Sequence, residues 1–397
     1  MPLRSASARS SPLRSRLRAA CVVALCVTAL GQAPASTAAA PAPRDADLRD
    51  QLEQLVHAPG GPPGAIAVLR RDGRTDVVRA GVADLATGRR PSPDDHMRIA
   101  STAKAFSGAV ALSLVDRHAL RLDEPLGERL PQLPSAWHQV TLRQLLNHTS
   151  GLPDFTESAE FLSILAADPH HHFDSRHLLD FVADLPLNFT PGTEYRYSNS
   201  DNIAVALMAE AATGTPYEQL PRTLVHRPLT LHNTSLAQDW RIPAPSLHGY
   251  DVAPPEPPED VSEVLSASGS WASGGIISTP ADMTRFISGY AGGALYGRNV
   301  VREQRRWIEG ASEPAGPGAN MAGLALFRYT TRCGVVLGHT GNYPGYTQLI
   351  AATPDGRRSL TFSVNTQINR EMKPDLLSRL RWVEENFVCA LLNRSVP

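Results

Sequence analysis

The sequence predicts a mixed fold of the α+β kind, in which an antiparallel sheet flanked by helices is joined to an inserted, mostly helical region. Three observations predict it. Strand patterning occurs near both ends of the chain, helical patterning dominates residues 100–264, and the apparent strands beyond residue 320 follow one another through short turns. Short connections between consecutive strands favour antiparallel pairing.

Length and composition are those of a globular protein with a sizeable core. The 397 residues are 42% hydrophobic and 19% charged, which is sufficient for one large or two intertwined domains. The 38 basic side chains nearly balance the 39 acidic ones. No overall field therefore attracts nucleic acid or an acidic surface, and we expect no nucleic-acid partner.

The first forty residues differ from the rest. An arginine-rich start leads into "RLRAACVVALCVTALGQ" and then into the small residues of "APASTAAAPAP", a layout typical of a secretory signal peptide. The apolar stretch is about 12 residues, shorter than the roughly 20 of a membrane helix. We predict a signal peptide over residues 1–40 and an exported mature protein without a stable membrane anchor; a retained N-terminal anchor is the alternative.

Export changes the interpretation of the four cysteines. Cys21 and Cys26 lie in the predicted signal, which leaves Cys333 and Cys389 as a pair in an oxidising compartment. We predict a disulfide between them, the alternative being two buried thiols. A loop of about 55 residues closed in this way would stabilise the fold by roughly 4 kcal/mol in chain-entropy terms.

The elements of the first two thirds of the chain follow from periodicity and turn residues. A helix is expected over residues 45–58, followed by strands over 64–73 and 74–88 that meet at the Asp72-Gly73 turn. Further helices are expected over 103–120, 141–151, 175–185, 202–214 and 217–229. The proline-rich segment 251–260 is expected to be a solvated loop.

The last third returns to strands. A helix over 279–293 precedes strands over 322–330, 334–341, 346–356 and 358–367 and a final helix over 374–392. Within residues 41–397, taken as one catalytic domain, we therefore expect a mixed α/β layer from residues 41–99 and 265–397 and a helical region from residues 100–264.

Ser101 and Lys104 lie three residues apart in "IASTAKAFSG", where a helix is expected to begin. A serine hydroxyl attacks a carbonyl near pH 7 only with a neighbouring base and a place to hold the oxyanion. The two positions share a helix face, and apolar neighbours favour a lowered pKa for Lys104. Alone the pattern is weak, because a serine cap followed by a solvated lysine occurs in many helices.

Two further motifs add chemistry. In "YRYSNSDN", Tyr197 can shuttle a proton and Asn199 can donate its amide to a substrate carbonyl; the alternative is a helix cap. In "LGHTGNYPGY", His339 and Thr340 can present donors to a carboxylate, and Gly341 lets a substrate backbone lie close to the strand edge. The alternative there is a simple turn at the end of a strand.

The three motifs, in this order and spacing, resemble those of the serine penicillin-recognising enzymes: D-alanyl-D-alanine carboxypeptidases, class C β-lactamases and their esterase relatives. "LLNHTSGLPDF", "FTPGTEYRYSNSDN" and "SWASGGIISTPADM" are similar to runs typical of that family. The resemblance covers essentially the whole predicted mature chain and implies a β-lactamase/transpeptidase-like fold. H-T-G in place of K-T-G, with its flanking cysteines, resembles the secreted actinobacterial-type carboxypeptidases.

The resemblance implies roles for the reacting groups. Ser101 would be the acylated nucleophile and Lys104 its proton partner. Tyr197 would act as general base and acid. The backbone N–H groups of Ser101 and Asn342 would form the oxyanion hole.

The resemblance also implies substrate contacts. Asn199 would bind the substrate amide, His339 takes the place of the commoner lysine, and Thr340 would bind the terminal carboxylate. Trp271 looks like a wall of the cleft. An arginine that helps hold the carboxylate in similar carboxypeptidases has no secure counterpart here, since Arg328 lies apparently one residue off.

The other histidine-containing motifs predict no chemical role. His148 in "LNHTSG" is interpreted as part of a helix-ending turn with Gly151, and the three adjacent histidines at 170–172 as a solvated loop, because metal ligands need spacing that lets them converge. We expect neither a metal nor a cofactor.

The expected function is a secreted serine D,D-carboxypeptidase that cleaves peptidoglycan-type peptides ending in D-Ala-D-Ala through an acyl-Ser101 intermediate, with β-lactams as acylating inhibitors. A β-lactamase or carboxylesterase would use the same acylation machinery. A non-catalytic β-lactam-sensing or wall-binding module is the alternative from another class. The sequence does not indicate an oligomeric state.

Overall fold

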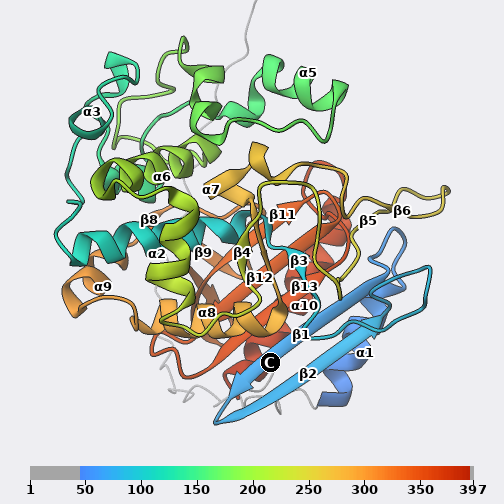
Figure 1. The fold of residues 1–397 in the computed structure, drawn as a ribbon. Helices are drawn as coiled ribbons and strands as arrows, with labels where there is room; N and C mark the ends of the chain where they lie inside the picture. The colour runs from blue at the N-terminus through green and yellow to red at the C-terminus, as the bar shows by residue number, and fades with distance from the viewer. Residues whose placement is uncertain (1–44, 394–397) are drawn as a thin grey trace, which may run out of the picture. The chain divides into compact units, whose positions relative to one another are not determined.

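A computed structural model of the protein describes residues 45–393, so the predicted signal peptide lies outside the described residues. Eight antiparallel strands form its main sheet, in the order β2-β1-β13-β12-β11-β10-β9-β8 (Figure 1). Their bounds are β1 Gly64–Arg71, β2 Arg74–Gly81, β8 Ile308–Glu309, β9 Ala319–Ala322, β10 Phe327–Thr331, β11 Gly334–Tyr343, β12 Tyr346–Ala352 and β13 Ser359–Val364.

The sheet joins the two ends of the described chain. Strand β1 pairs with β13, with Ala65 opposite Val364, although about 300 residues separate them. The single strand expected over 322–330 is wrong: β9 ends at Ala322 and β10 begins at Phe327. Between them the Gly323 N–H donates to the carbonyl of Leu326 at 2.8 Å, which reverses the chain.

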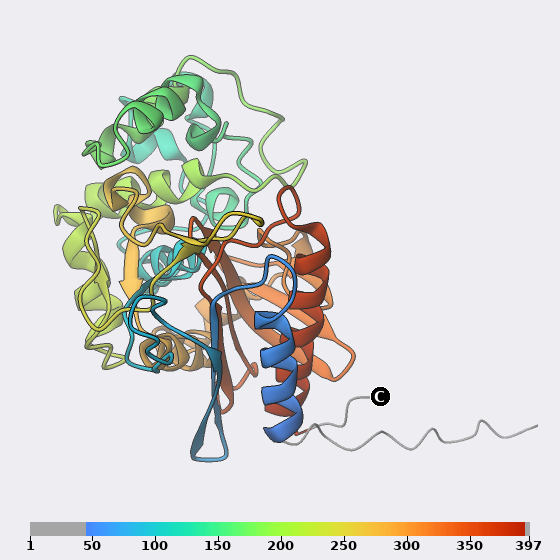
Figure 2. The same ribbon diagram turned by 90° about the vertical axis from the view of Figure 1, so that its right-hand side faces the viewer.

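Helices α1 (Asp45–Val56) and α10 (Pro374–Leu391) lie together on one face of the sheet (Figure 2). Buried apolar side chains of both helices and of strands β1, β2, β12 and β13 form one core there. Apolar residues recur at helical spacing in α10, and its buried stripe includes Leu380, Val383 and Phe387.

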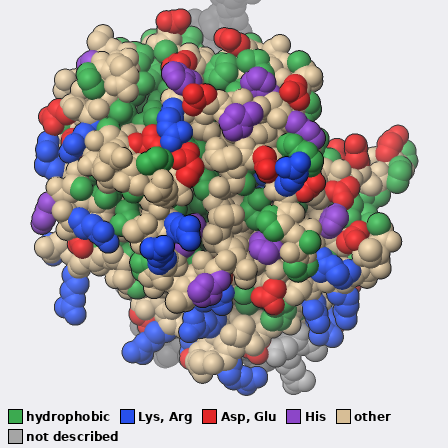
Figure 3. Space-filling model, viewed as in Figure 1, with side chains coloured by type: hydrophobic (Ala, Val, Ile, Leu, Met, Phe, Trp, Pro, Cys, Tyr) green, Lys and Arg blue, Asp and Glu red, His purple; other side chains and the backbone are tan. Residues whose placement is uncertain are grey.

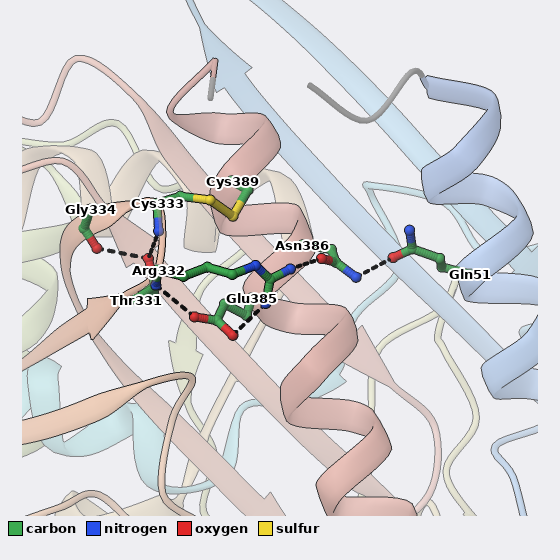
Figure 4. Close-up of a disulfide and its surroundings, with 8 residues drawn as sticks. All are labelled: Gln51, Thr331, Arg332, Cys333, Gly334, Glu385, Asn386 and Cys389. Carbon is green, nitrogen blue, oxygen red and sulfur yellow. Dashed lines mark hydrogen bonds and ion pairs between the residues drawn. A yellow bond between two sulfur atoms is a disulfide. The ribbon is translucent and has the colours of Figure 1, made fainter. Parts of the chain in front are cut away.

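A disulfide joins Cys333, in the turn between β10 and β11, to Cys389 of α10, with the Cα atoms 5.2 Å apart (Figure 4). Polar bonds surround it. Arg332 forms an ion pair with Glu385 at 2.6 Å, and Asn386 donates to Gln51 of α1 at 2.7 Å. This corner therefore ties the sheet to both helices on that face.

The opposite face of the sheet carries α8 (Pro280–Gly292) and the helical region, with a second and larger apolar core between them. Helix α2 (Ala103–Asp116) runs through that core and is buried from Ala103 to Leu114. Its small and apolar residues allow neighbours to pack on all sides. The other helices are α3 Leu126–Arg129, α4 Leu142–Leu146, α5 Ala159–Ala167, α6 Asn199–Thr213, α7 Trp271–Gly274 and α9 Arg298–Gln304.

Several local expectations differ from the structure. Residues 175–182 form a 3₁₀ helix rather than an α-helix, and 217–229 divide into a 3₁₀ turn and a π-helical turn over Arg222–His226. Helix α5 was not expected. The short strands form two small sheets, β3 (Met97–Arg98) with β7 (Ile276–Ser278) and β4 (Ser235–Leu236), and β5 (Tyr250–Asp251) with β6 (Glu259–Asp260).

The mixture of charges on the surface agrees with the nearly balanced composition. The face shown in Figure 3 carries side chains of both charges and no uniform patch of one sign, as a net charge of −1 suggests. Of the helices between residues 45 and 393, none is both long and apolar enough to cross a membrane. The same residues contain no group of three or more His, Cys, Asp or Glu side chains placed to hold a metal ion.

Candidate active site

Ser101 lies in a 3₁₀ turn (Ala100–Thr102) that leads directly into α2. The turn follows β3, and Ala100 adopts φ 51°, a left-handed conformation that non-glycine residues rarely adopt. One helical turn later, Lys104 places its Nζ 3.0 Å from the Ser101 Oγ. The sequence-predicted pair is therefore in direct contact, and Ser101 borders a cleft.

Gly341 brings strand β11 against this turn. A Cβ at position 341 would lie 2.6 Å from the Ile99 carbonyl oxygen and 3.3 Å from the Ser101 nitrogen. Any side chain would push the strand away from the nucleophile. Gly341 therefore lets the turn before Ser101 lie against β11; that it also lets a substrate backbone lie close to the strand edge stays a prediction.

Lys104 is almost completely buried, with 1% of its surface exposed. Besides Ser101, its Nζ donates to the Asn199 Oδ1 at 2.7 Å and to the Ser273 carbonyl at 2.8 Å. Burial lowers the pKa of Lys104 to about 7, although the negative charges of Asp154 and Glu313 act in the opposite direction. Near neutral pH a large fraction of this side chain is therefore an uncharged amine.

Tyr197 completes the group of three. Its ring lies 5.0 Å from the Lys104 Nζ, and its hydroxyl is buried without a hydrogen bond of good geometry. Burial raises the pKa of Tyr197 well above its ordinary value, while interaction with the Ser101 hydroxyl lowers it to a smaller extent. The phenol is therefore protonated at neutral pH.

Asn199 lines the cleft, but the polar atoms of its side chain are bonded within the protein. Its Nδ2 donates to the Asp154 Oδ2 at 2.8 Å and to the Thr156 Oγ1 at 3.2 Å, and its Oδ1 accepts from Lys104. Both amide hydrogens are thus used within the protein, which differs from the expected donation to a substrate. Asp154, which no motif singled out, fixes the amide and supplies a negative charge near Lys104.

The side chains of His339 and Thr340, in the H-T-G motif of β11, are buried. His339 is fully buried, its Nδ1 lies 2.6 Å from the Thr340 carbonyl oxygen, and burial lowers its pKa to about 3. Thr340 is 2% exposed and donates its hydroxyl to the Pro314 carbonyl at 2.6 Å. The expectation that these two side chains present donors to a carboxylate is therefore not met, because His339 is buried and the Thr340 hydroxyl is bonded to the loop at 311–315.

Trp271 is not a wall of the cleft, contrary to expectation. Its side chain is fully buried, packs edge-to-face with Tyr217 at a centroid distance of 5.2 Å, and donates its Nε1 hydrogen to Glu218 at 3.0 Å. Ser270 and Ser273 line the cleft in its place. A large aromatic residue in a sequence can belong to the core as well as to a ligand-binding surface.

The cleft beside Ser101 has a volume of about 880 Å³ and two dissimilar walls. One wall is apolar and comes mainly from α5 and the loop before α7. The other is polar and comes from the 311–315 loop, the end of β11 and the chain around 367–371. The apolar wall includes Phe161, Leu162, Leu165 and Leu265, and the polar wall includes Glu313, Asn342, Gln367, Asn369 and Arg370.

Three cleft residues bear on recognition. The Asn342 side chain is held by Thr347 and by the Ile368 carbonyl, at 3.0 and 2.8 Å, so its position at the cleft is fixed. Arg370 is exposed at the cleft, whereas Arg328 contacts Met321 and is not among the lining residues. Glu313 is exposed at the cleft; partial burial of its carboxyl group raises its pKa, although the Lys104 charge opposes this rise.

The chain matches a known protein family over most of its length. A sequence model of the family described as Beta-lactamase matches residues 49–381. The chain belongs to the beta-lactamase family. It is a serine hydrolase of this family, which also includes penicillin-binding proteins, and its antiparallel sheet with flanking helices is the expected β-lactamase/transpeptidase-like fold.

Individual members of the beta-lactamase family show moderate similarity. Penicillin-binding protein 4* of Bacillus subtilis is 24% identical over 313 residues, 75% of this chain and 66% of the relative. The D-alanyl-D-alanine-carboxypeptidase/endopeptidase AmpH of Escherichia coli is 28% identical over 264 residues, 64% of each chain. The match thus spans under two thirds of these relatives' length.

Among solved structures, a D-stereospecific amidohydrolase from Streptomyces sp. is similar with a TM-score of 0.72 and 28% identity. The match covers 82% of this chain and 95% of that one.

Proposed function

We propose that Lys104 is the base that activates Ser101, and that an acyl-Ser101 intermediate forms. One observation carries the proposal. Of the three atoms around the Lys104 Nζ, the Asn199 Oδ1 and the Ser273 carbonyl oxygen can only accept hydrogen bonds. A neutral amine with its two hydrogens on these acceptors turns its lone pair to the third atom, the Ser101 Oγ at 3.0 Å.

The reaction then balances with these groups. The Ser101 Oγ attacks the carbonyl carbon while its proton passes to Lys104, and the oxyanion lies between the backbone N–H groups of Ser101 and Asn342. The protonated Tyr197 phenol donates its proton to the leaving nitrogen, and the C–N bond breaks. The Lys104 ammonium returns the proton to Tyr197. Water then attacks the acyl carbon while its proton passes to the neutral Lys104; the C–O bond to Ser101 breaks, and the Lys104 ammonium returns that proton to the Ser101 Oγ.

For the substrate we propose peptidoglycan-type peptides ending in D-Ala-D-Ala, cleaved by an exported enzyme that β-lactams acylate. The names of the similar carboxypeptidase/endopeptidase and penicillin-binding protein support this choice. Arg370, exposed at the polar wall, is the group we assign to the terminal carboxylate. The covered Thr340 donates there only if the loop at 311–315 moves.

The test is release of free D-alanine from an acetylated Lys-D-Ala-D-Ala peptide by the mature protein. We expect release with the wild type, none with Ser101→Ala, and a KM increase of about tenfold with Arg370→Gln, as for one lost charge-assisted hydrogen bond. Arg370→Gln should leave turnover of an uncharged aryl ester unchanged. Hydrolysis of the ester with no release of D-alanine contradicts the carboxypeptidase proposal and leaves an esterase.

A second candidate is an amidase or aminopeptidase acting on D-amino acids with a free amino group. Glu313 favours it, because a carboxylate exposed in the cleft attracts a substrate ammonium. The similar Streptomyces structure is named a D-stereospecific amidohydrolase. Faster hydrolysis of free than of N-acetylated D-phenylalanine amide, abolished by Glu313→Gln, identifies this activity; equal rates exclude it.

A further inference from the structure

A buried pair of ionisable side chains lies behind Tyr197. The His148 Nδ1 lies 2.7 Å from the Asp201 Oδ2, and the Ser150 hydroxyl donates to the Asp201 Oδ1 at 2.5 Å. The exposed fractions of the three residues are 3%, 0% and 1%. Burying such groups costs free energy unless they serve a purpose or satisfy one another, and the proposed reaction assigns them no step.

His148 fixes the position of Tyr197 through one contact with its ring and one with the backbone before it. Its ring packs against the Tyr197 ring at a centroid distance of 4.5 Å and an interplanar angle of 38°. Its carbonyl oxygen accepts from the Arg196 N–H at 3.0 Å, which fixes the chain immediately before the tyrosine. His148 itself adopts φ 58°, a left-handed conformation that a surrounding network has to maintain.

We propose that His148 and Asp201 are positioning residues, which hold the Tyr197 phenol in place beside Ser101 and Lys104. The inference rests on the proposed function for the role of Tyr197. Because the Tyr197 hydroxyl has no hydrogen bond of good geometry of its own, its location depends on what packs against its ring. The pair supplies that surface, and Asp201, in the first turn of α6, fixes the rotation of the imidazole.

Uncharged forms of His148 and Asp201 are compatible with the nearby Lys104 ammonium. Burial lowers the pKa of His148 to about 3 and raises the pKa of Asp201 well above its ordinary value, so burial favours the uncharged form of each group. An imidazolium there would repel a Lys104 ammonium. The titratable groups that face the pair are Lys104 on α2, Asp154 before the 3₁₀ turn at 155–157, Tyr195 and Tyr197 before α6, and His339 on β11.

The proposal predicts a graded response at position 201. Asp201→Leu removes both hydrogen bonds and frees the imidazole to rotate, so acylation by p-nitrophenyl butyrate should slow by about 10- to 100-fold, the scale of a misplaced catalytic group. Asp201→Asn keeps an acceptor for Ser150 and a donor for His148, so it should recover most of that loss. Ser150→Ala, which disturbs folding less, should slow acylation a few-fold.

A measurement on the resting protein separates positioning from reactivity. Fluorine NMR of protein containing 3-fluorotyrosine gives a line for Tyr197, assigned with Tyr197→Phe. We expect this line to shift and broaden in Asp201→Leu and to stay in place in Asp201→Asn. His226→Phe is the matched control, because His226 is also buried but packs on Phe106 instead; it should lower the melting temperature without moving the line.

Three outcomes overturn the inference: an unmoved Tyr197 line in Asp201→Leu, a wild-type ester rate in that variant, or no recovery in Asp201→Asn. The proposed function fails by a different result, a Ser101→Ala protein that still reacts. A wild type without any activity would leave the fluorine line as the deciding readout, so the two proposals are tested separately.

Discussion

Replacing Asp154 by asparagine should shift the acid limb of the pH–rate profile to lower pH. Burial lowers the pKa of Lys104 to about 7, and the nearby Asp154 charge opposes this fall. If the neutral amine is the base, kcat/KM rises as the pH rises through that pKa. Asparagine keeps an acceptor for the Asn199 amide but removes the charge, so the ammonium loses stabilisation and the pKa of Lys104 falls further.

The structure sets the size of the shift. The Lys104 Nζ and the Asp154 Oδ2 contact the two ends of one amide, at 2.7 and 2.8 Å. Adding the width of that amide puts the two charges roughly 7 Å apart. At an effective dielectric constant of about 20, their Coulomb attraction at this distance is about 2 kcal/mol. This equals a pKa change of roughly 1.5 units.

The assay is kcat/KM for a neutral aryl ester between pH 5 and pH 9, in buffers of constant ionic strength. Glu157→Gln is the matched control, because Glu157 is an exposed carboxylate of the same loop that pairs with Arg196 at 3.3 Å. Its acid limb should stay where the wild type has it. An Asp154→Asn limb that coincides with the wild type, or moves to higher pH, would refute the assignment of Lys104 as the base.

Three further predictions concern the frame of the site. Because the disulfide links residues 56 apart, Cys333→Ser with Cys389→Ser should lower the free energy of unfolding by about 4 kcal/mol in denaturant titrations; a loss under about 1 kcal/mol contradicts this. Burial raises the pKa of Glu384 to about 8, so the native carboxyl is protonated where the unfolded one is not. The contribution of the Glu384 carboxyl to stability is then fully present below about pH 4.5 and is lost as the pH rises towards 8. Glu384→Gln should be more stable than wild type by about 4 kcal/mol at pH 8 and nearly equal at pH 4.5; parallel pH curves contradict this. Gly341→Ala places a Cβ 2.6 Å from the Ile99 carbonyl oxygen and should cut ester kcat/KM by about 100-fold with little change in melting temperature; a fully active variant would show that the strand can move aside.

Elements with strong local patterns could be predicted from the sequence. The hairpin around Asp72-Gly73, helix α8 and the strands from β11 to β13 all lie where periodicity and turn residues put them. The segment 322–330 failed because an apolar run does not show where the chain reverses. Residues 175–182 have the amphipathic spacing of a helix, but tertiary packing selects a tighter 3₁₀ conformation.

The site shows the same division. Ser101 and Lys104 could be paired from the sequence, because a separation of three positions places two side chains on one face of a helix. Asp154 could not be assigned, because only folding brings it to the Asn199 amide. Trp271 was misplaced for a related reason: its partner Glu218 lies 53 residues away, so the sequence does not show whether the indole faces solvent or core.

The most direct test of the account is the mass of the protein after reaction with a penicillin. We expect the intact mass to increase by one penicilloyl group, peptide mapping to place that group on Ser101, and Ser101→Ala to remain unmodified. A penicilloyl group on another residue, or equal labelling of Ser101→Ala, would contradict the claim that Lys104 activates this serine.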